Sequence, residues 1–136
     1  MTDYAKLLHA LKQGGVEFIV VGGVAAAVHG SARSTKDLDV VYSRTPQNIR
    51  RLASTLSPLK PRLRGAPEGL PFLWDERTVR AGLNFTLATA LGQLDVLGEI
   101  TGGGDYASLL PHSLPITVYG SEYLFLDLET LIRVGR

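Results

Sequence analysis

Cysteine is absent from the 136-residue sequence, and so are long uninterrupted apolar runs. The absence of cysteine excludes a disulfide framework and any metal site built from thiolates, and it is compatible with a reducing cytosol. No apolar run approaches the roughly 20 residues needed to cross a bilayer, and the first residues, Met1–Lys6, do not form a signal peptide. We therefore expect a cytoplasmic protein without a membrane partner.

Acidic residues are also absent from the segment between Val40 and Pro67, which carries six basic residues: Arg44, Arg50, Arg51, Lys60, Arg62 and Arg64. The formal net charge of the whole chain is only +1, so the overall balance does not indicate a polyanionic partner. A basic segment is most often a solvated face, but this one could also collect a phosphate-rich acceptor such as RNA. The alternation of its last three basic residues is compatible with a short edge strand.

The composition, with 45% apolar and 20% charged residues, is typical of a folded protein, and the length predicts one domain over residues 1–136. The sequence contains no internal repeat, low-complexity tract or linker. Short helical and strand patterns follow one another from a first amphipathic helix, with Thr2 as its N-cap, to a last helix at Leu128–Val134. They predict an α/β (α+β) fold with a small mixed β-sheet and flanking helices.

Two strand patterns, Phe18–Val21 and Asp37–Tyr42, flank a short Ala-rich helix at Val24–Val28. Because strands joined through a helix are typically parallel neighbours, we expect these two strands to run parallel. A hairpin-like pair of strand patterns at 84–89 and 93–97 follows later, and it places Asp95 on a central antiparallel strand.

Two glycines, Gly22 and Gly23, connect the first strand to the short helix. Glycine has no Cβ, so the backbone can turn tightly there and approach a ligand closely. The start of a helix also offers free N–H groups and the positive end of a dipole. The turn is a candidate phosphate-binding site, although many strand–helix turns use glycine without binding a ligand.

Two aspartates, Asp37 and Asp39, begin the second strand. Residues two apart on a strand point to the same face, so the two carboxylates repel each other and require a positive partner. A divalent cation such as Mg²⁺ is commonly held by one or two carboxylates together with substrate phosphates. The alternative is a solvated pair of aspartates at the end of a strand.

The order of these features resembles the signature of the nucleotidyltransferase superfamily to which DNA polymerase beta belongs. Val21-Gly22-Gly23 and Asp37-Leu38-Asp39-Val40 match that signature position by position, and Gln93-Leu94-Asp95-Val96-Leu97 is similar to the strand that carries the family's third carboxylate. The likeness is nearest to bacterial abortive-infection and toxin–antitoxin members, in which a His-Gly pair and an Arg-x-Thr follow, as His29-Gly30 and Arg33-Ser34-Thr35 do here.

The resemblance implies transfer of a nucleoside monophosphate from a nucleoside triphosphate such as ATP to an acceptor hydroxyl, with Mg²⁺ or Mn²⁺ as cofactor. The acceptor could be an RNA end, a protein or a small molecule. Catalytic and metal-binding roles fall on Asp37, Asp39 and Asp95. Nucleotide-binding roles fall on Gly22, Gly23, Arg33, Ser34 and Lys36. For His29, packing or capping is the more common role. For Ser34 and Thr35, hydrogen bonding within the loop is expected rather than a nucleophilic role.

Relatives usually continue with a further helix that carries a lysine, whereas this sequence ends at Arg136. The single domain could therefore lack a C-terminal helical extension, and Arg133 or Arg136 would take the place of that lysine. This departure supports a second hypothesis, a degenerate module that binds a nucleotide or a partner protein, for example in a toxin–antitoxin pair. Retention of all three aspartates argues for catalysis, because clustered carboxylates are costly when nothing offsets their charge.

Overall fold

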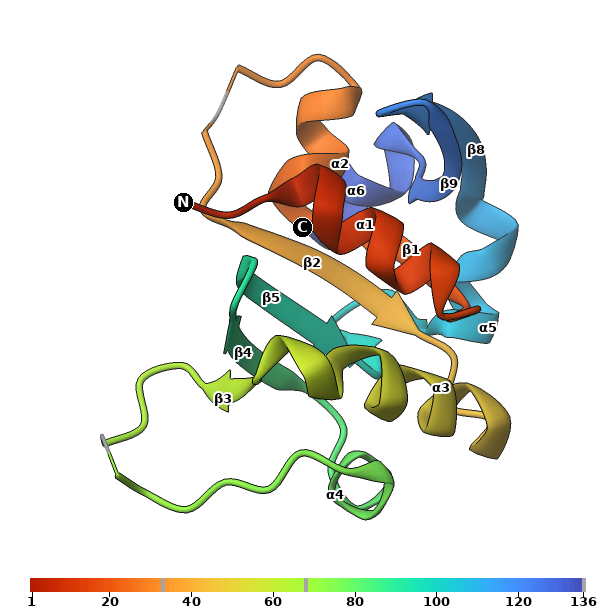
Figure 1. Ribbon diagram of the computed structural model, residues 1–136. Helices are drawn as coiled ribbons and strands as arrows, with labels where there is room; N and C mark the ends of the chain where they lie inside the picture. Colours follow the sequence, from red (N-terminus) through yellow and green to blue (C-terminus); the bar gives the residue numbers. More distant parts are fainter. Residues whose placement is uncertain (33, 68, 136) are drawn as a thin grey trace.

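The computed structural model describes residues 1–32, 34–67 and 69–135 (Figure 1). It confirms the predicted α/β (α+β) architecture around one mixed sheet of seven strands. In spatial order these strands are β3 (Arg62–Leu63), β4 (Phe85–Thr89), β5 (Gly92–Leu97), β2 (Asp37–Tyr42), β1 (Phe18–Val21), β9 (Ser121–Leu126) and β8 (Ser113–Val118). A separate small sheet pairs β6 (Glu99–Ile100) with β7 (Gly104–Asp105).

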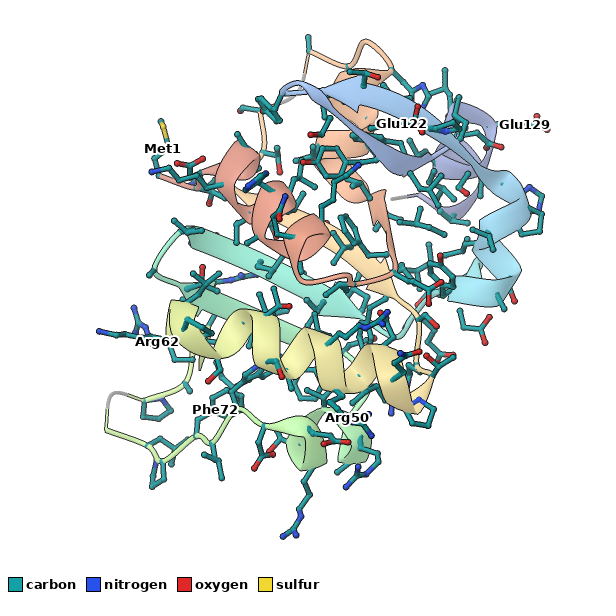
Figure 2. The ribbon with its side chains drawn as sticks, turned by 45° about the vertical axis from the view of Figure 1, so that its right-hand side comes forward. Met1, Arg50, Arg62, Phe72, Glu122 and Glu129 are labelled. Atoms are coloured by element: carbon teal, nitrogen blue, oxygen red, sulfur yellow. The ribbon has the colours of Figure 1, made fainter. Side chains whose placement is uncertain are left out.

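The helices form layers against the large sheet. Figures 1 and 2 show α1 (Tyr4–Gln13) and α3 (Pro46–Leu56) in front of the strands, and α2 (Gly22–Val28) beside α6 (Leu128–Val134) at the upper end of Figure 1. Shorter pieces complete the chain: α4 (Glu76–Ala81), α5 (Tyr106–Leu109) and single 3₁₀ turns at Ser57–Leu59 and Leu110–His112. Within the described ranges, no helix combines the length and the apolarity that crossing a membrane requires.

Alternation along β2 and β5 separates an apolar face from an acidic one. Leu38, Val40, Leu94 and Val96 are completely buried. Since side chains alternate along a strand, the aspartates next to these residues point to the opposite face of the sheet. The core thus fixes the side of the sheet on which Asp37, Asp39 and Asp95 lie.

The predicted parallel pairing of the first two strands is wrong. β1 and β2 are antiparallel neighbours, with Val21 opposite Asp39. The connecting helix α2 has seven residues, which span only about 10 Å, and the loop after it brings the chain back to the same end of the sheet. β2 therefore starts where β1 ends, and this turn places Gly22 beside the start of β2.

The parallel neighbour of β2 is β5, in register from Asp37 opposite Gln93 to Val41 opposite Leu97. The predicted hairpin is confirmed, because β5 is also antiparallel to β4. Asp95 thus lies on an interior strand that is antiparallel to one neighbour and parallel to the other.

The N-terminal residues differ from the prediction in one detail. The N-cap of α1 is Asp3, whose carboxylate accepts a hydrogen bond from the backbone of Lys6 at 3.0 Å. The hydroxyl of Thr2 instead donates to the carbonyl oxygen of Lys36 at 2.6 Å and accepts from the backbone N–H of Gln93 at 3.1 Å. Thr2 therefore connects the beginnings of β2 and β5.

Asp127 is the N-cap of α6, the helix that the sequence predicted with the observed bounds. Its carboxylate accepts a hydrogen bond from the backbone of Thr130 at 2.8 Å, and hydrogen bonding to Thr130 holds the pKa of Asp127 below its ordinary value. A lowered pKa means that this stabilisation is present above the ordinary carboxyl pKa and is lost as the pH falls through the folded-state pKa.

We expect Asp127→Ala to lower the free energy of unfolding by about 1 kcal/mol at pH 7, the usual effect of losing such a cap. Asp127→Asn should lose less, because the amide oxygen still accepts the hydrogen bond. Urea unfolding measured from pH 7 downwards checks both, since the difference between wild type and the alanine variant should shrink below about pH 4. An alanine variant with the same deficit at every pH would contradict this role.

Candidate active site

Three aspartates from two neighbouring strands converge on one face of the sheet. Asp39 on β2 lies opposite Asp95 on β5, and Asp37 is two residues before Asp39 on the same face. One carboxylate oxygen from each residue lies within 4.8 Å of the other two. The structure therefore brings together the three side chains that the sequence singled out, in a donor set of hard oxygen ligands that suits Mg²⁺ or Mn²⁺.

Gly22 makes room for one of these carboxylates. It has a φ angle of +70°, and a Cβ built on it would clash with the carboxylate of Asp39. Gly23 is similarly constrained, since its Cβ would lie 2.7 Å from the Cβ of Thr35. Helix α2 begins at Gly22 itself, two residues earlier than predicted. The glycine pair is therefore required by the close approach of β1 to the start of β2.

Thr35 orders the loop that leads into β2. Its hydroxyl lies within hydrogen-bonding distance of the backbone oxygen and of the carboxylate of Asp37, at 3.1 and 3.3 Å. Its own carbonyl oxygen accepts a hydrogen bond from the Tyr4 hydroxyl at 2.7 Å. Burial, followed by the charge of Asp37, raises the pKa of Tyr4, so this hydroxyl keeps its proton for the hydrogen bond. The expected hydrogen-bonding role of Thr35 is confirmed.

The carboxylate of Asp95 is more enclosed than that of Asp37. Its side chain is 13% exposed, compared with 29% for Asp37. Burial raises the pKa of Asp95, the Arg64 guanidinium lowers it, and the charge of Asp37 raises it further, so that the net direction is upward. A carboxylate with a raised pKa is a stronger base, which suits a group that removes a proton from a hydroxyl.

The arrangement of strands and helices is shared with two solved structures. A candidate nucleotidyltransferase from Thermotoga maritima matches with a TM-score of 0.58 and 14% identity, over 97% of this chain and 83% of that one. The antibiotic-resistance factor ANT(2'')-Ia matches with a TM-score of 0.54 and 15% identity, over 93% of this chain and 64% of that one. The chain has the nucleotidyltransferase fold. Neither a protein-family model nor a curated protein matches the sequence.

A fourth charged residue, Arg64, joins the three carboxylates in this nucleotidyltransferase fold. The sequence did not assign this arginine to the site. Nη2 of Arg64 donates to Oδ1 of Asp95 at 2.6 Å and lies 3.6 Å from Oδ2 of Asp37. Nη1 donates to the carbonyl oxygen of Leu87 at 2.9 Å. The alternation before Arg64 does mark an edge strand, β3, but the sequence carries no signal that this strand pairs with β4 and so delivers an arginine to Asp95.

Three other arginines of the segment, Arg44, Arg50 and Arg51, make contacts away from the carboxylate cluster. Arg44 donates to the hydroxyl of Tyr42 and to two backbone oxygens. Nε of Arg50 lies 3.8 Å from Oε2 of Glu76, and Arg51 donates to the carbonyl oxygen of Gly15. These contacts favour structural roles for the three arginines over a shared phosphate-collecting face.

The remaining predicted residues that the structure describes make no hydrogen bond with one another. Ser34 and Lys36 are exposed in the loop before Asp37, and Arg33 and Arg136 lie outside the described residues. His29 caps the end of α2, with Nε2 3.0 Å from the carbonyl oxygen of Leu126, as its expected packing or capping role requires. Nη1 of Arg133 donates to the carbonyl oxygen of Gly102 at 3.1 Å.

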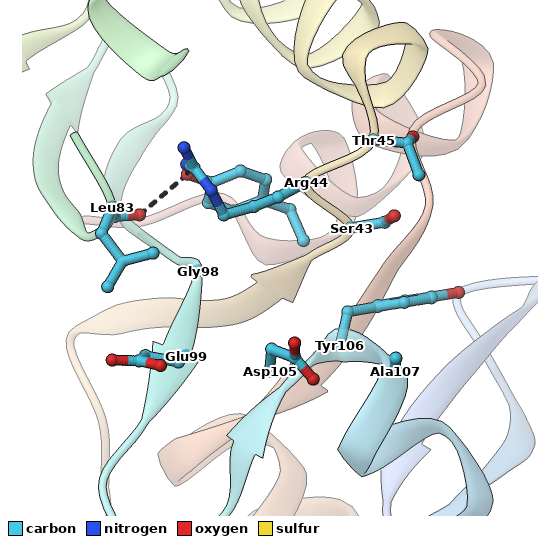
Figure 3. Close-up of a pocket in the computed structure, with 10 residues that line it drawn as sticks. Ser43, Arg44, Thr45, Leu83, Gly98, Glu99, Asp105, Tyr106 and Ala107 are labelled. Carbon is cyan, nitrogen blue, oxygen red and sulfur yellow. Dashed lines mark hydrogen bonds between the residues drawn. The ribbon is translucent and has the colours of Figure 1, made fainter. Parts of the chain in front are cut away.

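Two cavities lie at opposite ends of β2. One of about 570 Å³ is lined by Thr35 and Lys36, which precede Asp37, and by Gln93, which pairs with Asp37. The other, of about 400 Å³, lies around the end of β2, where the Tyr42 hydroxyl donates to the carbonyl oxygen of Leu83 (Figure 3). Of these two cavities, the first is the one that is lined by residues next to the carboxylate cluster.

Proposed function

We propose that this protein transfers a nucleoside monophosphate from a nucleoside triphosphate to an acceptor hydroxyl and releases pyrophosphate, in a reaction that depends on Mg²⁺ or Mn²⁺. The observation that carries the proposal is the convergence of Asp37, Asp39 and Asp95, within 4.8 Å, on a nucleotidyltransferase fold. A solvated pair of strand-end aspartates does not account for a third carboxylate delivered from a separate strand at the matching register.

Divalent cations would be held by Asp37 and Asp39, with Asp95 completing the set, because their carboxylate oxygens are close enough to share an ion. Such ions, when bound, would stabilise the charge on the attacking and leaving oxygens of an in-line displacement. Asp95 would accept the proton of the acceptor hydroxyl. The freed oxygen would then bond to the α-phosphorus as the bond to the β-phosphate oxygen breaks and pyrophosphate leaves.

The nucleotide would lie beside the glycine turn and the loop before β2. Gly22 and Gly23 would let the backbone approach the triphosphate, while Arg33, Ser34 and Lys36 would offer it two cations and a hydroxyl. Lys36 supports this placement, because it is exposed immediately before Asp37 and lines the larger cavity. The acceptor would be an RNA end, a protein or a small molecule; the resistance activity of ANT(2'')-Ia keeps small molecules among these classes.

A second candidate function is a degenerate module that binds a nucleotide or a partner protein, as in a toxin–antitoxin pair. The ion pair between Arg64 and Asp95 favours it, because the arginine offsets part of the carboxylate charge without any metal. Such a module would bind a nucleoside triphosphate without consuming it.

The test is incubation of the full chain with each of the four nucleoside triphosphates, Mg²⁺ and pools of RNA, protein and small-molecule acceptors. We expect pyrophosphate release and an acceptor whose mass, by mass spectrometry, has increased by one nucleoside monophosphate. Triphosphate binding without turnover would favour the degenerate module, and hydrolysis without a modified acceptor would contradict group transfer.

A further inference from the structure

We propose that Arg64 is a resident counter-ion of the carboxylate cluster, and that it keeps Asp37 and Asp95 from binding a divalent cation tightly until a nucleoside triphosphate is present. The inference rests on the proposed function, since it assigns to the same site a control over the order in which metal and nucleotide bind.

The position of the guanidinium is the first argument. Nη2 lies 2.6 Å from Asp95 and 3.6 Å from Asp37, and these are two of the three carboxylates that could share one ion. A cation that binds both carboxylates therefore competes with Arg64 for the same acceptor atoms or meets the repulsion of its charge at close range.

The second argument is that Arg64 is held in place from two sides. Its backbone N–H donates to the carbonyl oxygen of Thr86 at 2.9 Å, and Nη1 of its side chain donates to that of Leu87 at 2.9 Å. Both acceptors belong to β4, which is hydrogen-bonded to β5, the strand that carries Asp95. The guanidinium is therefore preorganised at the cluster, unlike the long, freely rotating side chains of most surface ion pairs.

Burial sets the strength of the competition. The side chains of Arg64 and Asp95 are 27% and 13% exposed, so solvent and salt screen their attraction less than they screen a surface pair. A charge-assisted hydrogen bond of this kind changes an equilibrium by roughly 10- to 100-fold. Metal binding to the carboxylates alone should be weakened by about that factor.

A nucleoside triphosphate removes this obstacle because it offers the arginine another partner. Phosphate oxygens match the planar fork of a guanidinium, with which they form paired hydrogen bonds. A triphosphate placed beside the cluster would therefore draw Arg64 from Asp95 and leave both carboxylates to the cation. Metal and nucleotide would each increase the affinity of the protein for the other.

The test compares Arg64→Gln with wild type and with Arg62→Gln. Arg62 is a matched control, because it lies on β3, two residues before Arg64, but is exposed and directed away from the sheet in Figure 2. Mn²⁺ affinity is measured on the full chain by electron paramagnetic resonance of the free ion, with and without a non-hydrolysable triphosphate analogue. We expect Arg64→Gln to bind Mn²⁺ about 10- to 100-fold more tightly than wild type without nucleotide, and Arg62→Gln to match wild type.

The analogue should tighten Mn²⁺ binding strongly in wild type and much less in Arg64→Gln. Arg64→Lys, which keeps the charge but lacks the fork, should have an intermediate affinity and replaces Arg64→Gln if circular dichroism shows that variant to be unfolded. Unchanged or weaker Mn²⁺ binding in the folded variant overturns the role of Arg64 and leaves the proposed function standing. If no protein binds Mn²⁺ even with the analogue, both proposals are wrong.

Discussion

Replacing Asp95 by asparagine is expected to lower kcat of nucleotidyl transfer by about 10³-fold or more. The amide cannot accept the proton of the acceptor hydroxyl, and general base catalysis alone typically contributes 10²- to 10⁴-fold. The substitution also replaces one of the three anionic oxygen ligands by a neutral amide oxygen and removes the anionic partner of Arg64. Single-turnover measurements with saturating nucleotide and acceptor would separate this loss from changes in binding.

Asp105→Asn is the matched control for this prediction. Asp105 caps α5 through a hydrogen bond from the backbone of Ser108, and asparagine can accept the same bond. The Asp105→Asn variant should therefore be as active as wild type. In addition, Mg²⁺ or Mn²⁺ added together with a non-hydrolysable triphosphate analogue should raise the Tm of wild type above that with the analogue alone, because an ion that binds only the folded protein stabilises it. The double variant Asp37→Asn/Asp39→Asn should show no such gain, because it lacks two of the three carboxylates. An Asp95→Asn enzyme that keeps activity within a few-fold of wild type would exclude Asp95 as the base.

Gly22→Ala is expected to lower the free energy of unfolding by about 3 kcal/mol and to abolish transfer. Alanine at the φ angle of +70° is strained by roughly 1–3 kcal/mol. Its methyl group must also displace the carboxylate of Asp39, and overpacking of this kind costs a further amount of about 1–3 kcal/mol. Urea unfolding measures the loss of stability, and the transfer assay measures the loss of activity.

Gly120→Ala separates backbone strain from the clash. Gly120 has nearly the same φ angle, +78°, but a Cβ there would meet no atom within 4 Å. We therefore expect a smaller loss of stability and no loss of activity. If both glycine variants were equally unstable and equally active, the close approach of Gly22 to Asp39 would have no bearing on the site.

Local patterns in the sequence were sufficient for the elements that carry the site. The β-branched residues of β1 and the alternation of aspartates with buried apolar residues on β2 and β5 both have local physical causes. The convergence of Asp37, Asp39 and Asp95 was likewise predicted, from the resemblance of their motifs to a known family.

Longer-range features were not predictable in the same way. The antiparallel pairing of β1 with β2 depends on the path of the loop after α2, and strand propensity is the same for either direction. Arg64 reaches Asp95, 31 residues away in sequence, only because the two-residue strand β3 pairs with β4. Neither a charge pattern nor a propensity reports such a pairing, so the arginine was predicted only as part of a basic segment.

The contacts of Thr2 have a practical consequence for protein engineering. Its hydroxyl joins the beginnings of both carboxylate-bearing strands, and Met1 and Thr2 line the cavity of about 570 Å³. A purification tag or fusion partner attached before Met1 would therefore emanate from the wall of the proposed substrate cavity. For assays of the kind described above, an affinity handle before Met1 should therefore be cleaved off before the measurement.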